Sequence, residues 1–525
     1  MTPETARTLS AAEQHEWYQR ATSRRALLRG GLVGAVGTGA AFAVPGLLGG
    51  GTADAAPASA SVGSAALLQQ APRPSGQLVV PFGRHLAFGA DPAREVSVSW
   101  QTAALVRRPF VRIGRTPWEL GSKVAADIRT RTTPRSDITA AVALPPSQAT
   151  ANVQQYYLHA TISHLRPGQT YYYFVGHDGW DVNGNIAAVR SFTTAPSGRV
   201  PFTFTAFGDE GITYDSVANT NLVRAQSPAF HLHAGDISYA ESGGEGLITD
   251  PFDPQLWDSF FTQIEPVAAT IPWQVAVGNH EMETWTSPHA YGGQFDRFAF
   301  PGRTSYYSFT YSNVAVISLD ANDLSNEIPA NRGYSGGAQT TWLTRQLAAF
   351  RRNSDIDFIV VYFHHCAYCT CTSHASEGGV RDHWVPLFDK YSVDLVINGH
   401  NHIYERTDPL RGGKITSAAP IGSTIHPAKQ GTTYVTAGAG GTSLYKFGVA
   451  DSYEGAINNN SAIASYVNVD GGTATETVAW SRIRYTGYCL LVVESTPAHR
   501  HGTSTLRVRG LTNTGVELDS FTLAR

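Results

Sequence analysis

FTFTAFGDEG, at residues 202–211, sets the pattern that organises the second half of this chain. Its first six residues form an apolar-rich run of the length of a buried strand, and Gly208-Asp209 follows at the strand end. Helical periodicity at Gly337 to Arg352 and at Gly379 to Tyr391 separates some runs of this kind. The other runs are Phe230 to Ala234, Trp273 to Val277, Val314 to Leu319, Phe358 to Phe363 and Leu395 to Ile397. Together they predict a layered α/β domain, whose ligands gather beyond the carboxyl ends of the strands.

Polar motifs follow five of these runs in a fixed order. Each motif alone is a common turn, because turns use Gly, Asp, Asn and His in any case. Together they bring two Asp, a Tyr, an Asn and three His to one sheet edge, an oxygen- and nitrogen-rich set suited to two first-row metals. The motifs are Gly208-Asp209-Glu210-Gly211, Gly235-Asp236-Ile237-Ser238-Tyr239, Gly278-Asn279-His280-Glu281, Val361-Tyr362-Phe363-His364 and Gly399-His400-Asn401-His402.

This ordered set resembles the motifs of the purple acid phosphatases, within the calcineurin-like metallophosphoesterases. The resemblance implies a Fe(III) ion held by Asp209, Asp236, Tyr239 and His402. It implies that Asp236 bridges to a second divalent metal (Zn, Fe or Mn), which is also held by Asn279, His364 and His400. Most metallophosphoesterases have Asp-x-His in the first motif; here Gly211 takes the His position, and Tyr239 supplies the ligand in its place.

The resemblance also implies the chemistry, which is hydrolysis of phosphomonoesters by a hydroxide that bridges the two metals. His280 is then the candidate donor to the phosphate or the leaving group. His374 and Glu377 match the second, substrate-facing pair of the family, although the plant members have two adjacent His where this chain has Ser373-His374. Two alternatives stay open: a phosphodiesterase acting on nucleotides or lipid headgroups with the same metals, and a catalytically dead cell-surface binding protein.

Residues 77–196 are predicted to form a separate all-β sandwich placed before the catalytic domain at 197–525. Short alternating runs with turn residues between them favour this fold. Leu165 to Tyr171 resembles the tyrosine corner of fibronectin type III modules, and we interpret the domain as a packing and positioning module. The predicted strands are Val96 to Trp100, Tyr156 to Ile162, Thr170 to Gly176 and Val189 to Thr194.

The first 55 residues are predicted to be a twin-arginine signal peptide. Arg24-Arg25 precedes a weakly apolar stretch from Gly30 to about Gly51, and Ala53-Asp54-Ala55 forms an A-x-A cleavage signal. Residues 56–76, which are rich in Ala, Ser and Pro, are predicted to be a flexible linker. A retained membrane anchor is the alternative, and the glycines of the apolar stretch argue against it. We therefore expect a secreted or cell-surface protein without a membrane partner after cleavage.

Composition narrows the partners and the state of the cysteines. Lys and Arg number 39 against 42 Asp and Glu, a net charge of -3, so no global basic field exists to bind nucleic acid. A small phosphate ester is the expected partner, and the oligomeric state stays open. The four cysteines, Cys366, Cys369, Cys371 and Cys489, are too few for a disulfide scaffold, and in an exported protein we expect a disulfide of open connectivity rather than a zinc site.

A last group of residues is predicted to have no direct role in the site. His365 should point to the opposite side of its strand from His364 as a supporting or structural residue. His231 and His233 should pack in the core, and His383 should lie on a helix surface. Arg303, Arg332 and Lys414 could hold an anionic substrate, but solvated loop charges are the preferred interpretation. Beyond about Thr407, Thr433 to Ala437, Tyr488 to Val493 and Thr505 to Val508 are predicted to complete the catalytic sheets, with loop insertions at Asn458 to Ser461 and Asp470 to Thr473.

Overall fold

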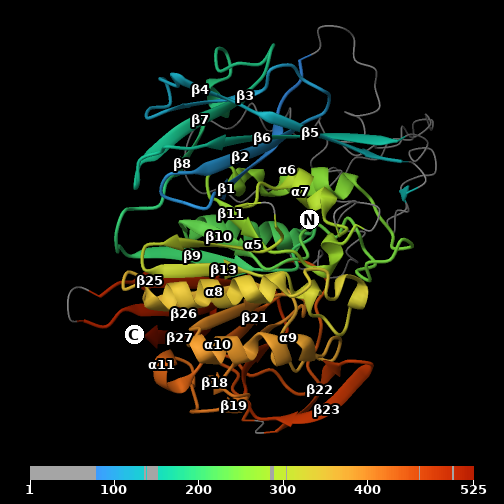
Figure 1. The fold of residues 1–525 in the computed structure, drawn as a ribbon, viewed down its shortest axis with the longest axis vertical. Coiled ribbons are helices and arrows are strands. Elements are labelled where there is room, and N and C mark those ends of the chain that lie inside the picture. Colours follow the sequence, from blue (N-terminus) through green and yellow to red (C-terminus); the bar gives the residue numbers. More distant parts are fainter. Residues whose placement is uncertain are drawn as a thin grey trace, which may run out of the picture.

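The computed structural model describes residues 78–134, 137–138, 152–283, 289–302, 304–459, 462–498 and 502–525. A small β-domain lies at one end of the molecule and a larger α/β domain fills the rest (Figure 1). The predicted signal peptide and linker lie outside the described residues. The predicted boundary at residue 197 falls in the connection between the last strand of the small domain, at Thr193, and the first strand of the large one, at Phe202.

The small domain consists of two antiparallel four-stranded sheets, as the alternating pattern predicts. One has the order β1-β2-β6-β5 and the other β4-β3-β7-β8. The Tyr171 hydroxyl accepts a hydrogen bond of 3.0 Å from the Arg166 backbone N–H, which is the contact that a tyrosine corner makes. The strands are β1 Phe82–Phe88, β2 Val96–Thr102, β3 Phe110–Gly114, β4 Ser122–Ala125, β5 Asp127–Thr133, β6 Val153–Ile162, β7 Thr170–Gly176 and β8 Arg190–Thr193.

Two seven-stranded mixed sheets form the larger domain. The first has the order β11-β10-β9-β25-β26-β27-β20 and the second β12-β13-β14-β16-β21-β17-β24. Strands of the first sheet are β9 Phe202–Phe207, β10 Phe230–His233, β11 Trp273–Val275, β20 Thr424–Ile425, β25 Cys489–Thr496, β26 Thr505–Thr512 and β27 Glu517–Ala524. Strands of the second are β12 Tyr307–Tyr311, β13 Val314–Ser318, β14 Phe358–Phe363, β16 Leu395–Asn398, β17 Tyr404–Thr407, β21 Thr433–Ala437 and β24 Ser481–Tyr485.

The sheets pack face to face and helices cover their outer faces, which gives an α/β/β/α sandwich. Side chains from both sheets, such as Phe204 and Val316, share one buried core. On the outside of the first sheet, α5 (Tyr214–Ala225) and α6 (Gln255–Ala268) contribute Val223 and Trp257 to a second core. On the outside of the second sheet, α8 (Ala338–Arg352) contributes Leu343 and Leu347 to a third. The α/β fold predicted from the sequence is therefore confirmed.

Two predicted elements differ from the structure. The helix predicted over Gly379 to Tyr391 is divided into α9 (Gly378–His383) and α10 (Val385–Tyr391), because Pro386, in the first turn of α10, has no N–H to continue the helical bonding. The loop insertion predicted at Asp470 to Thr473 is the turn of a hairpin between β22 (Ile463–Val469) and β23 (Gly472–Val478). This hairpin pairs with the two-residue strand β15 (Ser376–Glu377) beside the site. Of the other predicted insertion, Asn460 and Ser461 lie outside the described residues.

The small domain docks on α6 through buried polar contacts. Asp258 of this helix accepts hydrogen bonds from the amides of Gln101 (2.5 Å) and Gln155 (2.8 Å). Tyr173 donates to the Ala269 carbonyl at the helix C-terminus, over 2.7 Å. The small domain also contacts β11, where the Phe88 backbone N–H donates to Gln274 Oε1 over 2.7 Å, and α7 (Gly292–Arg297), where Arg131 pairs with Asp296 at 2.9 Å.

No helix in the described ranges is long and apolar enough to span a membrane.

Candidate metal centre

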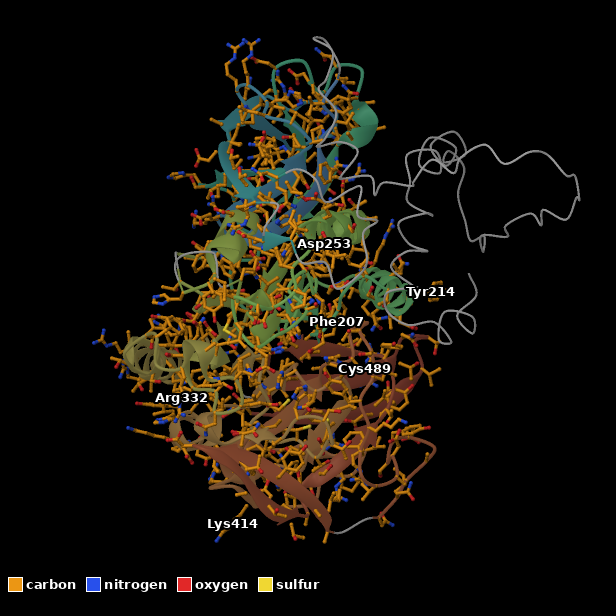
Figure 2. The ribbon with its side chains drawn as sticks, turned by 90° about the vertical axis from the view of Figure 1, so that its right-hand side faces the viewer. Phe207, Tyr214, Asp253, Arg332, Lys414 and Cys489 are labelled. Carbon is orange, nitrogen blue, oxygen red and sulfur yellow. The ribbon has the colours of Figure 1, made fainter. Side chains whose placement is uncertain are left out.

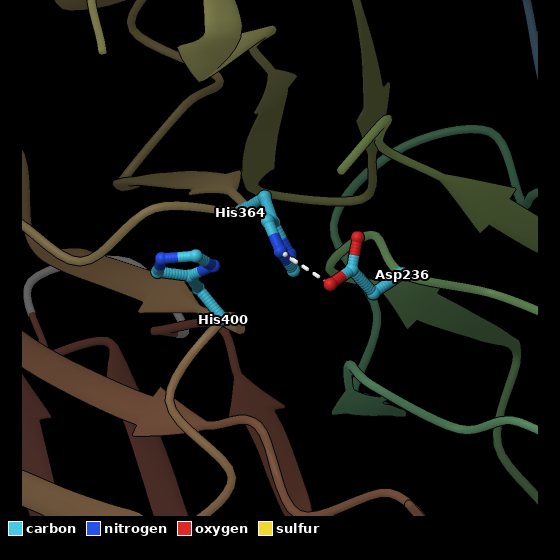
Figure 3. A group of neighbouring side chains, drawn as sticks. All are labelled: Asp236, His364 and His400. Carbon is cyan, nitrogen blue, oxygen red and sulfur yellow. Dashed lines mark ion pairs between the residues drawn. The ribbon is translucent and has the colours of Figure 1, made fainter. Parts of the chain in front are cut away.

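The sequence motifs meet where the two sheets come together at the carboxyl ends of their parallel strands. Asp209 and Asp236 follow β9 and β10, which pair in parallel in the first sheet. His364 and His400 follow β14 and β16, which pair in parallel in the second. Asp236, His364 and His400 place one potential ligand atom each within 4.8 Å of one another (Figure 3). Four loops that lie far apart in the sequence therefore form one site.

Four of the seven predicted ligands have strained backbone conformations. Asp209, Asp236, Tyr239 and His400 have φ of 60°, 51°, 55° and 66°. Side-chain-bearing residues adopt this left-handed region at a cost of about 1–3 kcal/mol each, and such residues cluster at functional sites. Hydrogen bonds and packing contacts around these residues must offset this conformational cost in the folded protein.

Glycines next to the ligands allow the loops to approach closely. A β-carbon added to Gly278 would lie 2.1 Å from Asp236 Oδ1, and one added to Gly399 would lie 2.6 Å from Asp209 Oδ2. A β-carbon at Gly211 would lie 3.4 Å from the ring of Tyr239. The Tyr239 ring therefore lies next to residue 211, the position at which Asp-x-His motifs have their histidine. This is the location expected if Tyr239 takes the place of that histidine as a ligand.

Three electron-pair donors converge around His364. Its Nδ1 donates to the Ala234 carbonyl over 2.8 Å, which leaves Nε2 facing Asp236 Oδ2 and Asn279 Oδ1, both at 3.0 Å. The amide nitrogen of Asn279 donates to the Gly244 carbonyl, so its oxygen must be the atom that faces His364. Three acceptors repel one another unless a cation or proton lies between them. Burial lowers the pKa of His364, but the negative charges of Asp236 and Asp209 outweigh this effect and raise the pKa to about 10. The space next to His364 Nε2 therefore favours positive charge.

A second group of donors forms around His402. Its Nδ1 donates to the Ser443 carbonyl over 2.6 Å, which directs Nε2 toward the Tyr239 hydroxyl (3.0 Å) and Asp209 Oδ1 (3.3 Å). Burial lowers the pKa of His402 to about 3, so the ring is neutral and keeps the lone pair that a metal needs. Oxygen-rich coordination by a phenol and a carboxylate suits a hard cation.

Asp236 lies between the two groups. Its carboxylate interacts electrostatically with His364 and His400 on one side and with Asp209, Tyr239 and His402 on the other. Burial and repulsion from Asp236 raise the pKa of Asp209 well above its usual range. The ion pairs of these two buried carboxylates within the described chain are with histidines only, with no Lys or Arg. The donor set therefore fits two cations better than it fits the protein alone.

His280 and His374 both lie next to this centre and are partly exposed. His280 donates from Nδ1 to the Glu241 carbonyl over 2.7 Å, and its Nε2 lies 3.9 Å from Asp236 Oδ2. The Nε2 of His374 lies 3.2 Å from the hydroxyl of Tyr445, a residue whose ring stacks on His402 at 3.9 Å. Sequence reasoning missed Tyr445, because it belongs to none of the five motifs.

The structure places Glu377 differently from its expected substrate-facing position. Its side chain is buried, and it accepts hydrogen bonds from the backbone N–H groups of residues 326, 327 and 379 and from the Ser325 hydroxyl. Glu377 therefore fixes the loop at 325–327 and does not face the metal ligands. Glu281, quoted in its motif without a role, has a similar use: it accepts from the backbone N–H groups of Asp236, Ile237 and Gly278.

The remaining predictions have mixed outcomes. His365 does not point away from the site; its ring packs 4.4 Å from that of His400, because β14 ends at Phe363 and strand alternation no longer applies.

The expected disulfide is wrong for this structure, in which all four cysteines are free and buried. His231 and His233 pack in the core against Trp273, and His383 is exposed, as predicted. Arg332 pairs with Asp470, and Figure 2 places Arg332 and Lys414 near the outer edge, away from Phe207 at the end of β9. Arg303 lies outside the described residues.

Comparisons with known proteins match both domains of this chain. Residues 81–194 match the family described as purple acid phosphatase, N-terminal domain, and residues 202–404 match calcineurin-like phosphoesterase. An uncharacterised protein of Mycobacterium tuberculosis is 34% identical over 394 residues, 69% of each chain. Purple acid phosphatase 22 of Arabidopsis thaliana is 31% identical over 284 residues, 51% of this chain and 57% of its own. The structure of a purple acid phosphatase from yellow lupin seeds superimposes with a TM-score of 0.63 at 21% identity, covering 85% of this chain and 75% of the lupin one.

The fold and the donor set define a metal-dependent phosphoesterase. Within that class, the chain belongs to the purple acid phosphatases.

Proposed function

We propose that this protein is an acid phosphatase that hydrolyses phosphomonoesters at a dinuclear centre of Fe(III) and a divalent Zn, Fe or Mn ion. The observation that carries the proposal is the convergence of seven donors into two groups that share Asp236, with His280 next to Asp236 and His374 next to His400. Asp209, Tyr239 and His402 would hold the first ion, and Asn279, His364 and His400 the second. When bound, two such cations polarise the phosphoryl group and lower the pKa of a coordinated water.

The protein groups in this proposal bind and orient the substrate. A monoester dianion has three non-ester oxygens, two for the cations and one for protein donors. The Nε2 atoms of His280 and His374 are the candidates to meet the third oxygen or the leaving group. The Tyr445 ring and hydroxyl lie beside His402 and His374, so they narrow the space next to the centre and favour a small substrate.

The proposal predicts that monoesters are better substrates than diesters. A diester offers only two non-ester oxygens and carries a second bulky group, which leaves one of the two histidines without a partner. We expect kcat/KM for p-nitrophenyl phosphate to exceed that for bis-p-nitrophenyl phosphate by at least ~10-fold, about 1.4 kcal/mol, with an optimum on the acid side of neutrality. Side-by-side kinetics with metal-replete protein measure this ratio.

Other outcomes would favour the alternatives. A preference for the diester, or an alkaline optimum, would support a phosphodiesterase with the same metals. Hydrolysis of neither ester by protein that holds two metals per chain would support the catalytically dead binding protein.

A second prediction concerns the metal next to Tyr239. A phenolate bound to Fe(III) gives a charge-transfer band, so the wild-type protein should be violet to pink. Tyr239→Phe should abolish this absorption without unfolding the protein, since the hydroxyl contacts only Asp209 and His402 among the described residues. Tyr445→Phe, which removes the hydroxyl of another tyrosine at the site, should keep the colour. A colourless, active wild type that contains iron would contradict the assignment.

The sequence also supports a proposed route to the cell exterior. Arg24-Arg25 and the A-x-A signal at residues 53–55 suggest twin-arginine export, which carries proteins already folded and would let the metals bind beforehand. N-terminal sequencing of exported protein should start at Ala56, and a start at Met1 would contradict cleavage.

A further inference from the structure

Glu327, which belongs to none of the sequence motifs, lies between His400, a predicted ligand of the second metal, and His374, the predicted substrate-facing histidine. Glu327 Oε1 lies 2.5 Å from His374 Nδ1, and Oε2 lies 3.1 Å from His400 Nε2. The rings of His374 and His400 are themselves in contact, with centroids 4.2 Å apart. Each oxygen of Glu327 therefore has its own histidine, one on the substrate side and one on the metal side.

Hydrogen bonds from neighbouring residues fix the position of Glu327. Asn468 of β22 donates to Oε2 over 2.9 Å, and its carbonyl accepts from the Asn326 side chain over 3.2 Å. The buried carboxylate of Glu377 accepts from the backbone N–H groups of both Asn326 and Glu327. Glu377 and the β22–β23 hairpin thus position the Glu327 side chain, which gives the His-x-x-Glu motif an indirect connection to the site.

The two hydrogen bonds determine which ring nitrogens face the site. His400 donates from Nε2 to Glu327, so Nδ1 carries the lone pair available to a metal. His374 donates from Nδ1, so Nε2 faces away from Glu327 toward Tyr445. A carboxylate that accepts from a metal-binding histidine fixes its tautomer and ring orientation.

The same three side chains could instead hold an additional metal ion. Their distances argue against it. Two neighbouring ligands of one ion, with bonds of about 2.0–2.2 Å, lie about 3.0 Å apart in octahedral geometry and about 3.4 Å apart in tetrahedral geometry. The 2.5 Å between Glu327 Oε1 and His374 Nδ1 is shorter than either distance, and is short even for a charge-assisted N–H···O hydrogen bond of about 2.7–2.9 Å. A proton therefore fits between these atoms better than an ion does.

We propose that Glu327 is a positioning residue that aligns the second-metal ligand His400 and the substrate-side His374 through its two oxygens. This inference rests on the proposed function for its kinetic consequences, while its metal-binding consequence stands without any activity. It acts on one half of the centre only, because Glu327 contacts none of the described ligands of the first metal.

Glu327→Gln tests the proposal in the full-length protein. The amide keeps the shape and one acceptor but cannot accept from both histidines. We expect the affinity for Zn²⁺ at the second position to fall by ~10–100-fold, while the visible absorption of the Tyr239 side stays unchanged. We also expect KM for p-nitrophenyl phosphate and Ki for inorganic phosphate to rise when Zn²⁺ saturates the site, because His374 is no longer held.

Matched variants separate this role from a structural one. Glu476→Gln breaks the Glu476–Arg381 ion pair on the same hairpin, and should change neither Zn²⁺ affinity nor KM. Asn468→Ala, which removes one donor to Glu327, should produce a smaller effect in the same direction. In a double-mutant cycle, Glu327→Gln should raise KM less in a His374→Ala background than in the wild type, because one of its targets is gone.

Three results would overturn the proposal. The first is a Glu327→Gln protein whose Zn²⁺ affinity and KM stay within ~2-fold of wild type. The second is a Glu327→Gln protein that loses the visible absorption as well as Zn²⁺. The third is a wild-type chain that holds a third metal ion, which Glu327→Gln removes. If Glu327→Gln does not fold, unchanged Zn²⁺ affinity in a folded Asn468→Ala protein overturns it equally. A wild type that hydrolyses no ester would refute the proposed function alone, since the Zn²⁺ titration would still report on Glu327.

Discussion

Asp236→Ala should remove both metals and the phosphatase activity together. The carboxylate faces His364 Nε2 at 3.0 Å, and its charge acts on the donors of both groups, so no other side chain replaces it for either ion. We expect metal content to fall from about two ions per chain to well below one, and kcat/KM to fall by at least ~10³-fold, about 4 kcal/mol. Elemental analysis and kinetics on the same preparation measure both quantities.

Asp258→Asn is the matched control for this prediction. Asp258 is also a buried aspartate, but it bonds Gln101 and Gln155 where the small domain docks. The control should keep both metals and full activity. If Asp236→Ala retains one tightly bound metal of each pair, Asp236 is a ligand of the other ion only, and the bridging assignment is wrong.

His280→Ala should separate chemistry from metal binding. The ring is anchored through Nδ1 on the Glu241 carbonyl, which directs Nε2 toward the centre. It packs against the Tyr239 ring, with centroids 4.5 Å apart, but is not itself one of the predicted ligands. We expect both metals and the visible absorption to remain, while kcat falls by ~10²–10⁴-fold, as for the loss of a general acid. Metal analysis with steady-state kinetics tests this.

The leaving group sharpens the same test. If His280 protonates the leaving oxygen, the loss should be larger for phenyl phosphate than for p-nitrophenyl phosphate, whose phenolate leaves without a proton. An equal loss on both esters would assign His280 to the phosphate oxygens instead. His383→Ala, on the exposed surface of α9, should behave as wild type. Normal turnover of His280→Ala would refute any catalytic role.

Many strands and helices could be predicted from the local pattern of apolar residues in the sequence. Runs such as Phe202–Phe207 and Phe358–Phe363 form strands with the predicted bounds, because strands of a sheet that is covered on both faces are rich in apolar and β-branched residues. The hairpin of β22 and β23 was missed because its outward residues are polar and its turn, Asp470 to Thr473, has the composition of a loop. The helix over residues 379–391 was predicted as one because periodicity continues across Pro386.

The sequence by itself determined the chemical types and order of the candidate metal donors, since each follows a recognisable strand at its carboxyl end. Only the tertiary structure decided how they are held. The left-handed backbone of Asp236 and the protonated ring nitrogen of His364 depend on contacts with residues far away in the chain. Glu327, like Tyr445, reaches the site through a loop with no motif. Its role depends on Asn468, 141 residues further along, and no local pattern encodes a contact of that range.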